Sequence, residues 1–257
     1  MFFLPKEQVP EGVGFTTFGA THLIWLVSMA LIAAVVIVVY RKADPKKKNI
    51  IRLILGWLIV FSEILKNIVA ACTGTFGVGH LPFHLCGINI LIILFDLFKP
   101  TKVTRNFLYY FCIPGAALAL LFPNWTALPS FNFFCIHSFT IHAMLVLYPL
   151  LLINSDDFKP EIKQMLWSIV LLIAMAIPIY FINLWLDTNF MFLMDPEQGN
   201  PLGLFEQYLG SHLWGFPILL PIVMFIMYIP FFFIKKKPMK DETLKPQKIE
   251  EKEEITV

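Results

Sequence analysis

Seven long runs of apolar residues, separated by short polar connections, organise this sequence. The runs cover residues 20–40, 49–71, 81–97, 107–122, 131–153, 165–186 and 213–234. A helix needs about 20 mostly apolar residues to cross the hydrocarbon core of a bilayer. The pattern therefore predicts an all-α, polytopic membrane protein with seven transmembrane helices. The third and fourth runs are short for a full crossing, and Pro114-Gly115 predicts a kink or tilt in the fourth.

The connections between the runs alternate in charge. The first, third and fifth connections and the start of the tail contain the basic residues Arg41, Lys42, Lys46, Lys47, Lys48, Lys99, Lys102, Arg105, Lys159, Lys163 and Lys235–Lys237, and the second, fourth and sixth contain none. Because basic connections stay in the cytoplasm, the N-terminus is predicted outside and the C-terminus inside. The predicted parts are an extracytoplasmic segment (1–19), a membrane domain (20–234) and a charged cytoplasmic tail (235–257) of a multi-pass protein of the cell membrane.

Composition agrees with this interpretation. Hydrophobic residues make up 58% of the chain and charged residues 15%, whereas a soluble domain is about 45–50% apolar and about 25% charged. A net charge of +2 is too small to indicate nucleic acid as a partner. Four cysteines in apolar surroundings, without a zinc-type CxxC spacing, indicate neither a disulfide framework nor a zinc site. We expect no metal and no cofactor.

Depth in the membrane is the most informative property of the polar residues. All six histidines, His22, His80, His84, His137, His142 and His212, fall in the predicted outer half. Glu63 and Lys66 lie there too, three residues apart on one helical face. Ionisable groups inside a membrane usually face the bundle interior or a wet cavity. This pair is either a structural ion pair or part of a polar cavity, and in the second case His22, His84 and His137 join it as candidate substrate-binding residues.

The segment around Cys86 carries the candidate chemistry. In HLPFHLCGIN, Asn89 follows Cys86 by three residues and shares its helical face. A cysteine beside an amide donor could serve as a nucleophile with an oxyanion partner, although a lone membrane cysteine is usually a small packing residue. His80 and His84 share a face if the helix begins early enough, but His84 lies about 200° from Cys86 and cannot face the same point.

Two histidines compete as the partner of Cys86. His137 and His142 are five residues apart, about 140° around one helix, so only one of them can face a given point. Counted from the predicted helix starts, Cys86 lies roughly 8 Å deep, His137 about 9 Å and His142 about 16 Å. Depth therefore favours His137, unless an aromatic belt at Phe131–Phe134 raises the whole segment.

Three stretches of the sequence resemble a known family. HLPFHLC, IHAMLVLYPLLLI and NFMFLMDPEQGNPLGLFEQYLGSHLWGFP together resemble the bacterial YwaF-type integral membrane proteins. This group is similar to an animal transmembrane acyltransferase that remodels ether phospholipids. More distantly it is similar to androgen-induced serpentine hydrolases, which cleave fatty acid esters of hydroxy fatty acids with a Thr and a His.

The resemblance implies a Cys/His pair. In the acyltransferase the nucleophile is a Cys directly after a Pro, and its partner is a His seven residues before another Pro. When the acyltransferase motif is aligned with this sequence without a gap, its Cys position falls on Phe83, and Cys86 is the nearest cysteine. His142 matches the second position because Pro149 follows it by seven residues. The family register thus favours His142, where depth favours His137.

We therefore expect a membrane-embedded lipid acyltransferase or ester hydrolase that acts on a phospholipid or fatty ester. Cys86 would be the nucleophile, His142 the general base, and Asn89 the oxyanion donor. Two alternatives stay open: a metal- or haem-binding protein that uses the six histidines as ligands, and a non-catalytic transporter or accessory membrane protein with Glu63 and Lys66 as a gate.

Overall fold

The computed structural model describes residues 1–155, 158–196 and 202–232, and within these ranges the regular structure is helical and contains no strand. The helices are α1 (Ala20–Lys42), α2 (Pro45–Cys72), α3 (Leu85–Phe98), α4 (Lys102–Phe107), α5 (Ile113–Leu121), α6 (Phe133–Ile153), α7 (Ile162–Leu186), α8 (Leu202–Leu209) and α9 (Gly215–Phe232). Short helical turns are Lys6–Gln8, Val78–His80, Phe190–Phe192 and His212–Trp214. The predicted charged tail, 235–257, lies outside the described residues.

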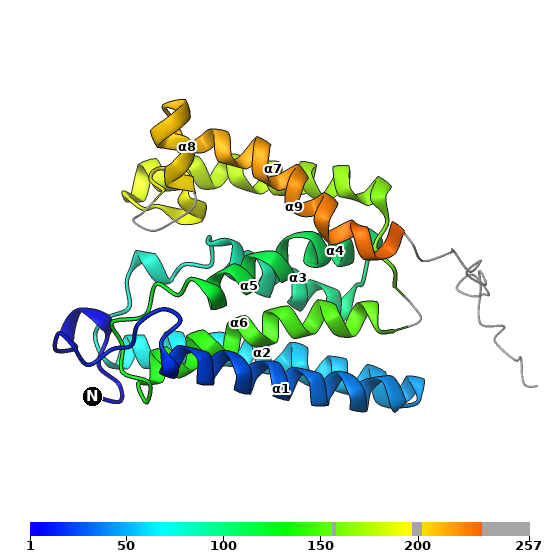
Figure 1. Cartoon of the computed structure of the whole chain (residues 1–257), viewed down its shortest axis with the longest axis horizontal. Coiled ribbons are helices and arrows are strands. Elements are labelled where there is room, and N and C mark those ends of the chain that lie inside the picture. The colour runs from blue at the N-terminus through cyan, green and yellow to red at the C-terminus, as the bar shows by residue number, and fades with distance from the viewer. Residues whose placement is uncertain (156–157, 197–201, 233–257) are drawn as a thin grey trace, which may run out of the picture.

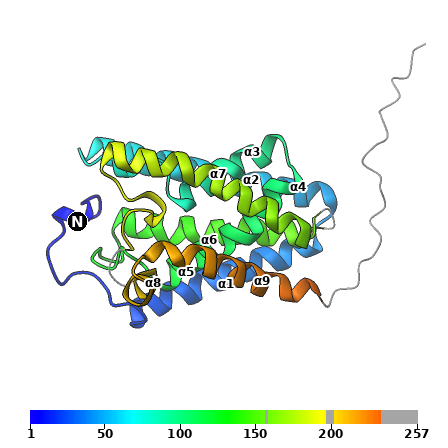
Figure 2. The ribbon, with the colours of Figure 1, turned by 90° about the horizontal axis from the view of Figure 1, so that it is seen from above.

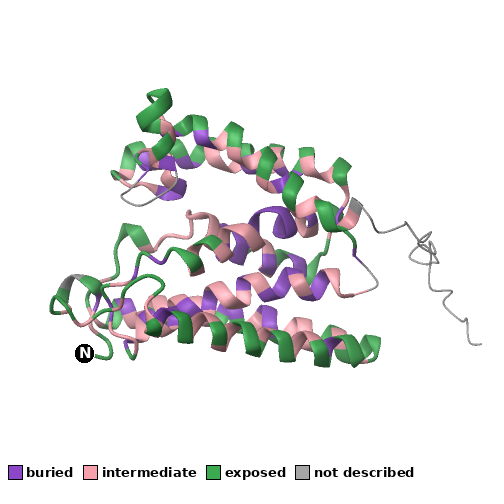
Figure 3. Ribbon diagram, in the orientation of Figure 1, coloured by how far each residue is buried: buried purple, intermediate pink, exposed green. Residues whose placement is uncertain are grey.

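The long helices run roughly parallel to one axis, in both perpendicular views (Figures 1 and 2). α6 contacts α1, α2, α3 and α5, and its side chains Leu145, Tyr148 and Leu151 are fully buried. α7 contacts α4, and α9 contacts the segment after α4, Leu108–Cys112. Both helices are joined to the α6 group in this way. Figure 3 shows the buried residues concentrated on the inner helices and the exposed ones on the outer helices.

Many of the exposed residues on α1 and α7 are large and apolar. Ile24, Leu31 and Val35 on α1 and Leu166 and Phe181 on α7 each expose more than half of their surface. Such faces would be unfavourable in water, because apolar surface is stabilised by removal from it. Lipid tails are a suitable environment for them. The all-helical multi-pass interpretation of the sequence therefore agrees with the distribution of apolar surface.

Five helical segments are long and apolar enough to cross a membrane: α1, α2, α6, α7 and His212–Phe231. The predicted third crossing corresponds to α3, whose 14 residues span about 21 Å at 1.5 Å per residue, less than the ~30 Å hydrocarbon core. The predicted fourth is divided between α4, a π-helical segment (Leu108–Cys112) and α5. Five crossings therefore meet the length criterion among the described residues, and the full set of seven stays a prediction.

The π-helical segment has a local cause in Pro114. Proline has no N–H to donate, and its ring would collide with the carbonyl of Tyr110, four residues earlier. The helical hydrogen-bond pattern changes one residue before Pro114, where the Ile113 N–H donates to the Leu108 carbonyl, five residues back instead of four. The helix is thus altered just before Pro114, and the kink or tilt that the sequence predicts there stays a prediction.

The start of α2 differs from the predicted boundary. α2 begins at Pro45 instead of residue 49, because Asp44 caps it: the Lys47 N–H donates to Asp44 Oδ1 at 2.9 Å. Proline at the first helical position loses no hydrogen bond, since that N–H would have no partner in the helix. Of the basic residues in the predicted first connection, Lys46, Lys47 and Lys48 therefore belong to the first turn of α2, and Arg41 and Lys42 to the last turn of α1.

Helix direction alternates along the chain, so the basic helix ends gather at one end of the bundle. This end contains the last turn of α1, the first turns of α2, α4 and α7, and the last turn of α6 (Figure 1, right). The N-terminus and the segments 73–84, 122–132 and 187–196 lie at the opposite end. We refer to these as the basic end and the N-terminal end.

We expect reporter fusions to place the basic end in the cytoplasm and to decide whether α3 crosses the membrane. Reporters after Lys46 and Lys102 should give cytoplasmic signals, and those after Gly77 and Pro129 external signals, because basic connections stay inside. Gly77 and Lys102 bracket α3, so signals from the same side would show that α3 does not cross. An external signal after Lys46 would reverse the predicted orientation.

A candidate active site at the start of α3

The position of Cys86 follows from where α3 begins. Leu81 precedes Pro82 and is extended (ψ 144°), as expected for a residue before proline, and His84 is also extended (ψ 153°). α3 therefore starts at Leu85, four residues after the predicted boundary, and Cys86 lies in its first turn. His80 and His84 precede the helix, so the shared face considered for them does not form.

Gly87 allows the preceding turn to pack directly on the start of α3. A Cβ atom at this position would lie only 2.8 Å from the Cα atom of Pro82, closer than real carbon contacts. Because any larger residue would push the backbone of Pro82 away, Gly87 helps to fix where the first turn of α3 lies.

Cys86 and His142 form a hydrogen-bonded pair. The Cys86 Sγ lies 3.3 Å from His142 Nε2, and His142 Nδ1 lies 2.7 Å from the Ser138 carbonyl oxygen. A carbonyl can only accept, so Nδ1 carries the ring proton and Nε2 presents its lone pair to the thiol. The Trp125 ring stacks on the imidazole with centroids 5.2 Å apart. The imidazole is therefore held in the tautomer and orientation of a general base.

The first turn of α3 offers free amide donors beside this thiol. Its first main-chain bond joins the Ile88 N–H to the His84 carbonyl at 3.0 Å. Among the described residues, the N–H groups of Leu85, Cys86 and Gly87 have no acceptor. Unpaired N–H groups at a helix N-terminus carry partial positive charge and bind anions. This turn can therefore stabilise an oxyanion formed next to Cys86 Sγ.

Asn89 lies one turn further along α3. Its side chain is 1% exposed, and its Oδ1 has no hydrogen-bond partner. The i,i+3 spacing from Cys86 puts both residues on one helical face. An unsatisfied buried acceptor is costly, so Asn89 Oδ1 can accept from an O–H or N–H group that enters from the Cys86 side, whereas an oxyanion would need the Asn89 Nδ2 as its donor.

His137 points elsewhere. Its Nε2 lies 3.6 Å from Glu63 Oε2, and Glu63 in turn pairs with Lys66 one turn further along α2. Glu63 also interacts electrostatically with Cys86 and His142. The three predicted substrate-binding residues Glu63, Lys66 and His137 thus form one cluster between α2 and α6 close to the pair, and His142, not His137, contacts the thiol.

His22 and His84 have backbone partners of their own. The fully buried His22 accepts from the Phe18 N–H at 2.8 Å and donates to the Leu120 carbonyl at 2.8 Å. His84 Nδ1 accepts from the Met191 N–H at 3.4 Å. His22 therefore joins α1 to α5 with both ring nitrogens bonded to the backbone, and its role in substrate binding stays a prediction. His84 is the extended residue before α3, so the predicted 200° helical offset from Cys86 does not apply to it.

The histidines do not converge on one point. No group of three His, Cys, Asp or Glu side chains among the described residues is close enough to hold a metal ion. Individual histidines bond to different parts of the backbone instead. His212, for example, bonds to the Phe192 carbonyl at 3.1 Å, whereas His22 bonds to Phe18 and Leu120. The geometry thus gives no observation in favour of the metal or haem alternative.

The Cys/His pair is packed rather than set in a large open cavity. Neither the pocket of about 150 Å³ at the basic end nor the one around the N-terminus is lined by Cys86 or His142. Trp125 covers one face of the imidazole, so that face is closed to a substrate. Both side chains nevertheless keep partial exposure, so a reagent or lipid carbonyl can approach them.

Sequence reasoning missed a second charged cluster at the basic end. Asp96, fully buried near the end of α3, accepts from Arg52 Nη1 at 3.2 Å, from Arg105 Nε at 3.1 Å and from the Tyr148 hydroxyl at 2.9 Å. A carboxylate inside the apolar run ILIILFDLF was the available signal, because such a group needs partners. Its partners come from three other helices and cannot be read from the run itself.

The fold and these contacts define a multi-pass membrane protein with a partly exposed thiol–imidazole pair. Residues 17–228 match the TMEM164 family. Because this range is most of the chain, the protein belongs to the TMEM164 family. Comparison with curated proteins and with solved structures gave no match.

We expect a small membrane-permeant thiol reagent to modify Cys86 faster than Cys112 and Cys135, which expose none of their surface. His142→Gln should slow alkylation of Cys86 about tenfold or more, because the base that takes the thiol proton is lost. Peptide mapping by mass spectrometry measures each rate, and the exposed Cys72 should be unaffected. Equal rates at Cys86 and Cys112 would contradict the described access.

Proposed function

We propose that this protein is a membrane-embedded acyltransferase or ester hydrolase that acts on a phospholipid or fatty ester of the cell membrane. The observation that carries the proposal is the 3.3 Å contact between Cys86 Sγ and His142 Nε2, with the imidazole tautomer set by Ser138. A thiol with a neutral, oriented base is the arrangement of an activated nucleophile.

In the first half-reaction, His142 Nε2 takes the thiol proton and Cys86 Sγ attacks the carbonyl carbon of the ester. The oxygen of the tetrahedral intermediate gains negative charge and is bound by the unpaired N–H groups of the first turn of α3, with the Asn89 amide as a further donor. When the C–O bond breaks, the imidazolium gives its proton to the departing alcohol. The products are an acyl thioester on Cys86 and a lysolipid or free alcohol.

In the second half-reaction, an acceptor hydroxyl gives its proton to His142 Nε2 and attacks the thioester carbon. The C–S bond then breaks, and the imidazolium returns the proton to sulfur. If the acceptor is a lysolipid, the acyl group is transferred, and if it is water, a fatty acid is released. The free thiol and neutral imidazole are regenerated in both cases.

The surroundings of the pair support a lipid substrate. Cys86 and His142 are partly exposed within a bundle whose outer faces are apolar, so a fatty chain can approach along the helices. The resemblance to YwaF-type proteins, and through them to an ether-phospholipid acyltransferase, points to the same chemistry. The nucleophile position differs, because Phe83 follows Pro82 where the acyltransferase has Cys. α3 begins after this turn, and its first-turn cysteine is the one that meets His142.

Incubation with a fluorescent or radiolabelled phospholipid should leave an acyl group on the protein that hydroxylamine removes, because thioesters are cleaved by this reagent. Cys86→Ala should abolish the adduct. Cys72→Ala and Cys135→Ala are matched controls and should retain it. Absence of an adduct from the wild-type protein with phospholipids and fatty esters alike would argue that Cys86 is a packing residue.

His142→Gln and His137→Gln separate the two candidate bases. His142→Gln should slow adduct formation by about 10²–10⁴-fold, the usual contribution of general base catalysis. His137→Gln removes an imidazole of the same helix that contacts Glu63 and should have a much smaller effect. Single-turnover labelling rates measure both variants. A larger loss in His137→Gln would reassign the base.

A further inference from the structure

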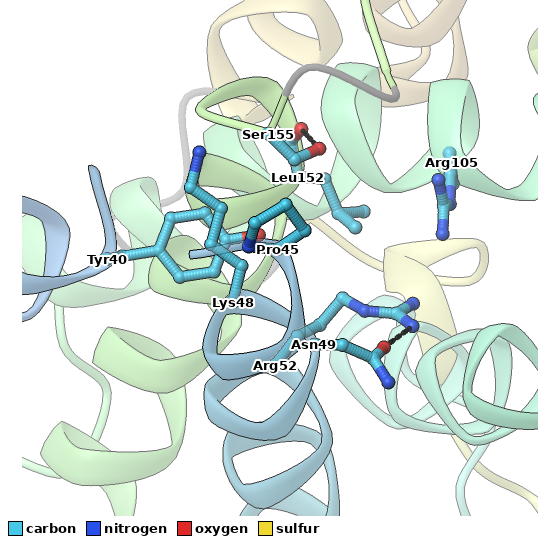
Figure 4. A pocket seen from close by; sticks show the side chains of 8 residues that line it. All are labelled: Tyr40, Pro45, Lys48, Asn49, Arg52, Arg105, Leu152 and Ser155. Carbon is cyan, nitrogen blue, oxygen red and sulfur yellow. Dashed lines mark hydrogen bonds between the residues drawn. The ribbon is translucent and has the colours of Figure 1, made fainter. Parts of the chain in front are cut away.

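The pocket at the basic end of the bundle is separate from Cys86 and His142. Its volume is about 150 Å³, and it is lined by Tyr40, Pro45, Lys48, Asn49, Arg52, Arg105, Leu152 and Ser155 (Figure 4). These residues come from the end of α1, the first two turns of α2, α4 and the end of α6. The pocket is therefore built by four helices, independently of the Cys86 site.

The charge of its wall is unbalanced. Arg52 and Arg105, 14% and 15% exposed, both pair with the fully buried Asp96. Two guanidinium groups thus face one carboxylate, and the described members of this cluster carry one excess positive charge. An uncompensated charge at so low an exposure is costly, and an anion in the pocket would compensate it.

Arg105 has unused hydrogen-bond donors that can bind this anion. Its Nε donates to Asp96 Oδ1, and its two terminal nitrogens have no acceptor among the described residues. Arg52 has fewer unpaired donors, because its Nη1 donates to Asp96 and its Nη2 donates to Asn49 Oδ1 at 2.7 Å. Asp96 therefore orients the Arg105 guanidinium while leaving its two terminal N–H₂ groups free. Such a fork matches phosphate oxygens.

The depth of the pocket fits a phospholipid head group. α2 has 28 residues and is about 42 Å long at 1.5 Å per residue, longer than the ~30 Å hydrocarbon core. Its first two turns, which line the pocket, therefore reach the head-group layer. A volume of about 150 Å³ exceeds that of a single water, about 30 Å³, several times and admits a phosphate group.

We propose that this pocket binds the phosphate group of an anionic ligand, a phospholipid head group or a soluble phosphate, with Arg105 as its principal donor and Arg52 and Lys48 on its wall. The proposal does not depend on the chemistry at Cys86. Basic pockets between helices on the cytoplasmic side are suited to anionic head groups, and this one has a preoriented guanidinium.

The test uses the full chain in maltoside micelles, which contain no phosphate. Calorimetric titration with inorganic phosphate at constant ionic strength measures one source of the ligand. Native mass spectrometry with short-chain phosphatidylglycerol, compared with diacylglycerol of the same chains, measures the other. We expect the wild-type protein to bind phosphatidylglycerol and not diacylglycerol. Binding of inorganic phosphate alone would support the site and identify its ligand as soluble.

Arg105→Gln should weaken binding about tenfold or more, the loss expected for a hydrogen bond to a charged group. The remaining Arg52–Asp96 pair is neutral, so the buried carboxylate keeps a partner. Lys42→Gln is the matched control, because it removes one charge from the same end of the bundle outside the pocket. Equal weakening by both variants would show general surface attraction and overturn the proposal.

A second variant tests the pocket without removing a charge. Ser155→Leu adds volume where the pocket is lined and should also abolish phosphatidylglycerol binding, while Cys86 alkylation, at the other end of the bundle, reports that the variant is folded. If folded Ser155→Leu protein binds as the wild-type protein does, the ligand lies elsewhere and the proposal is wrong. Failure of the wild-type protein to bind either ligand would also overturn it.

Discussion

The carboxylate of Asp96 is the constraint on which much of the arrangement depends. A buried charge without partners costs several kcal/mol, and here α2, α4 and α6 supply Arg52, Arg105 and Tyr148 to the same two oxygens. These contacts fix the basic end of α3 against three other helices. Cys86 precedes Asp96 by ten residues, about 15 Å along α3. The depth of Cys86 is therefore set from the opposite end of its own helix.

This constraint explains why Cys86 meets His142. α3 has only 14 residues, so a helix fixed at the basic end cannot reach the level at which α6 begins. The turn before Leu85 extends into the bundle, and Cys86 reaches His142, nine residues after the start of α6 at Phe133. If α3 and α6 began at the same membrane surface, Cys86 would lie at the depth of His137. Because α3 begins deeper than α6, Cys86 lies at the depth of His142 instead.

The sequence predicts the helices well because apolar runs of membrane length have few other solutions. It predicts individual ends poorly, since the start of α2 depends on a cap at Asp44, and the start of α3 on how Pro82 packs on Gly87. At the site, helical periodicity could not place His84 relative to Cys86, because His84 is extended and precedes α3. The choice of His142 and the partners of Asp96 and His22 could not be predicted from one run, because each is a contact between helices distant in sequence.

The two charged clusters differ in their balance, and this difference separates what each can do. Near Cys86, Glu63 and Lys66 neutralise each other, so the site has no fixed net charge from this pair, and a thiolate and imidazolium can form and disappear there as a reaction proceeds. At the basic end, Arg52 and Arg105 share the carboxylate of Asp96, so the described members of this cluster carry one excess positive charge. A neutral surrounding suits groups that change their charge during each turnover, whereas an excess positive charge suits a bound anion. The proposed thioester chemistry and the proposed anion site thus lie at opposite ends of the bundle.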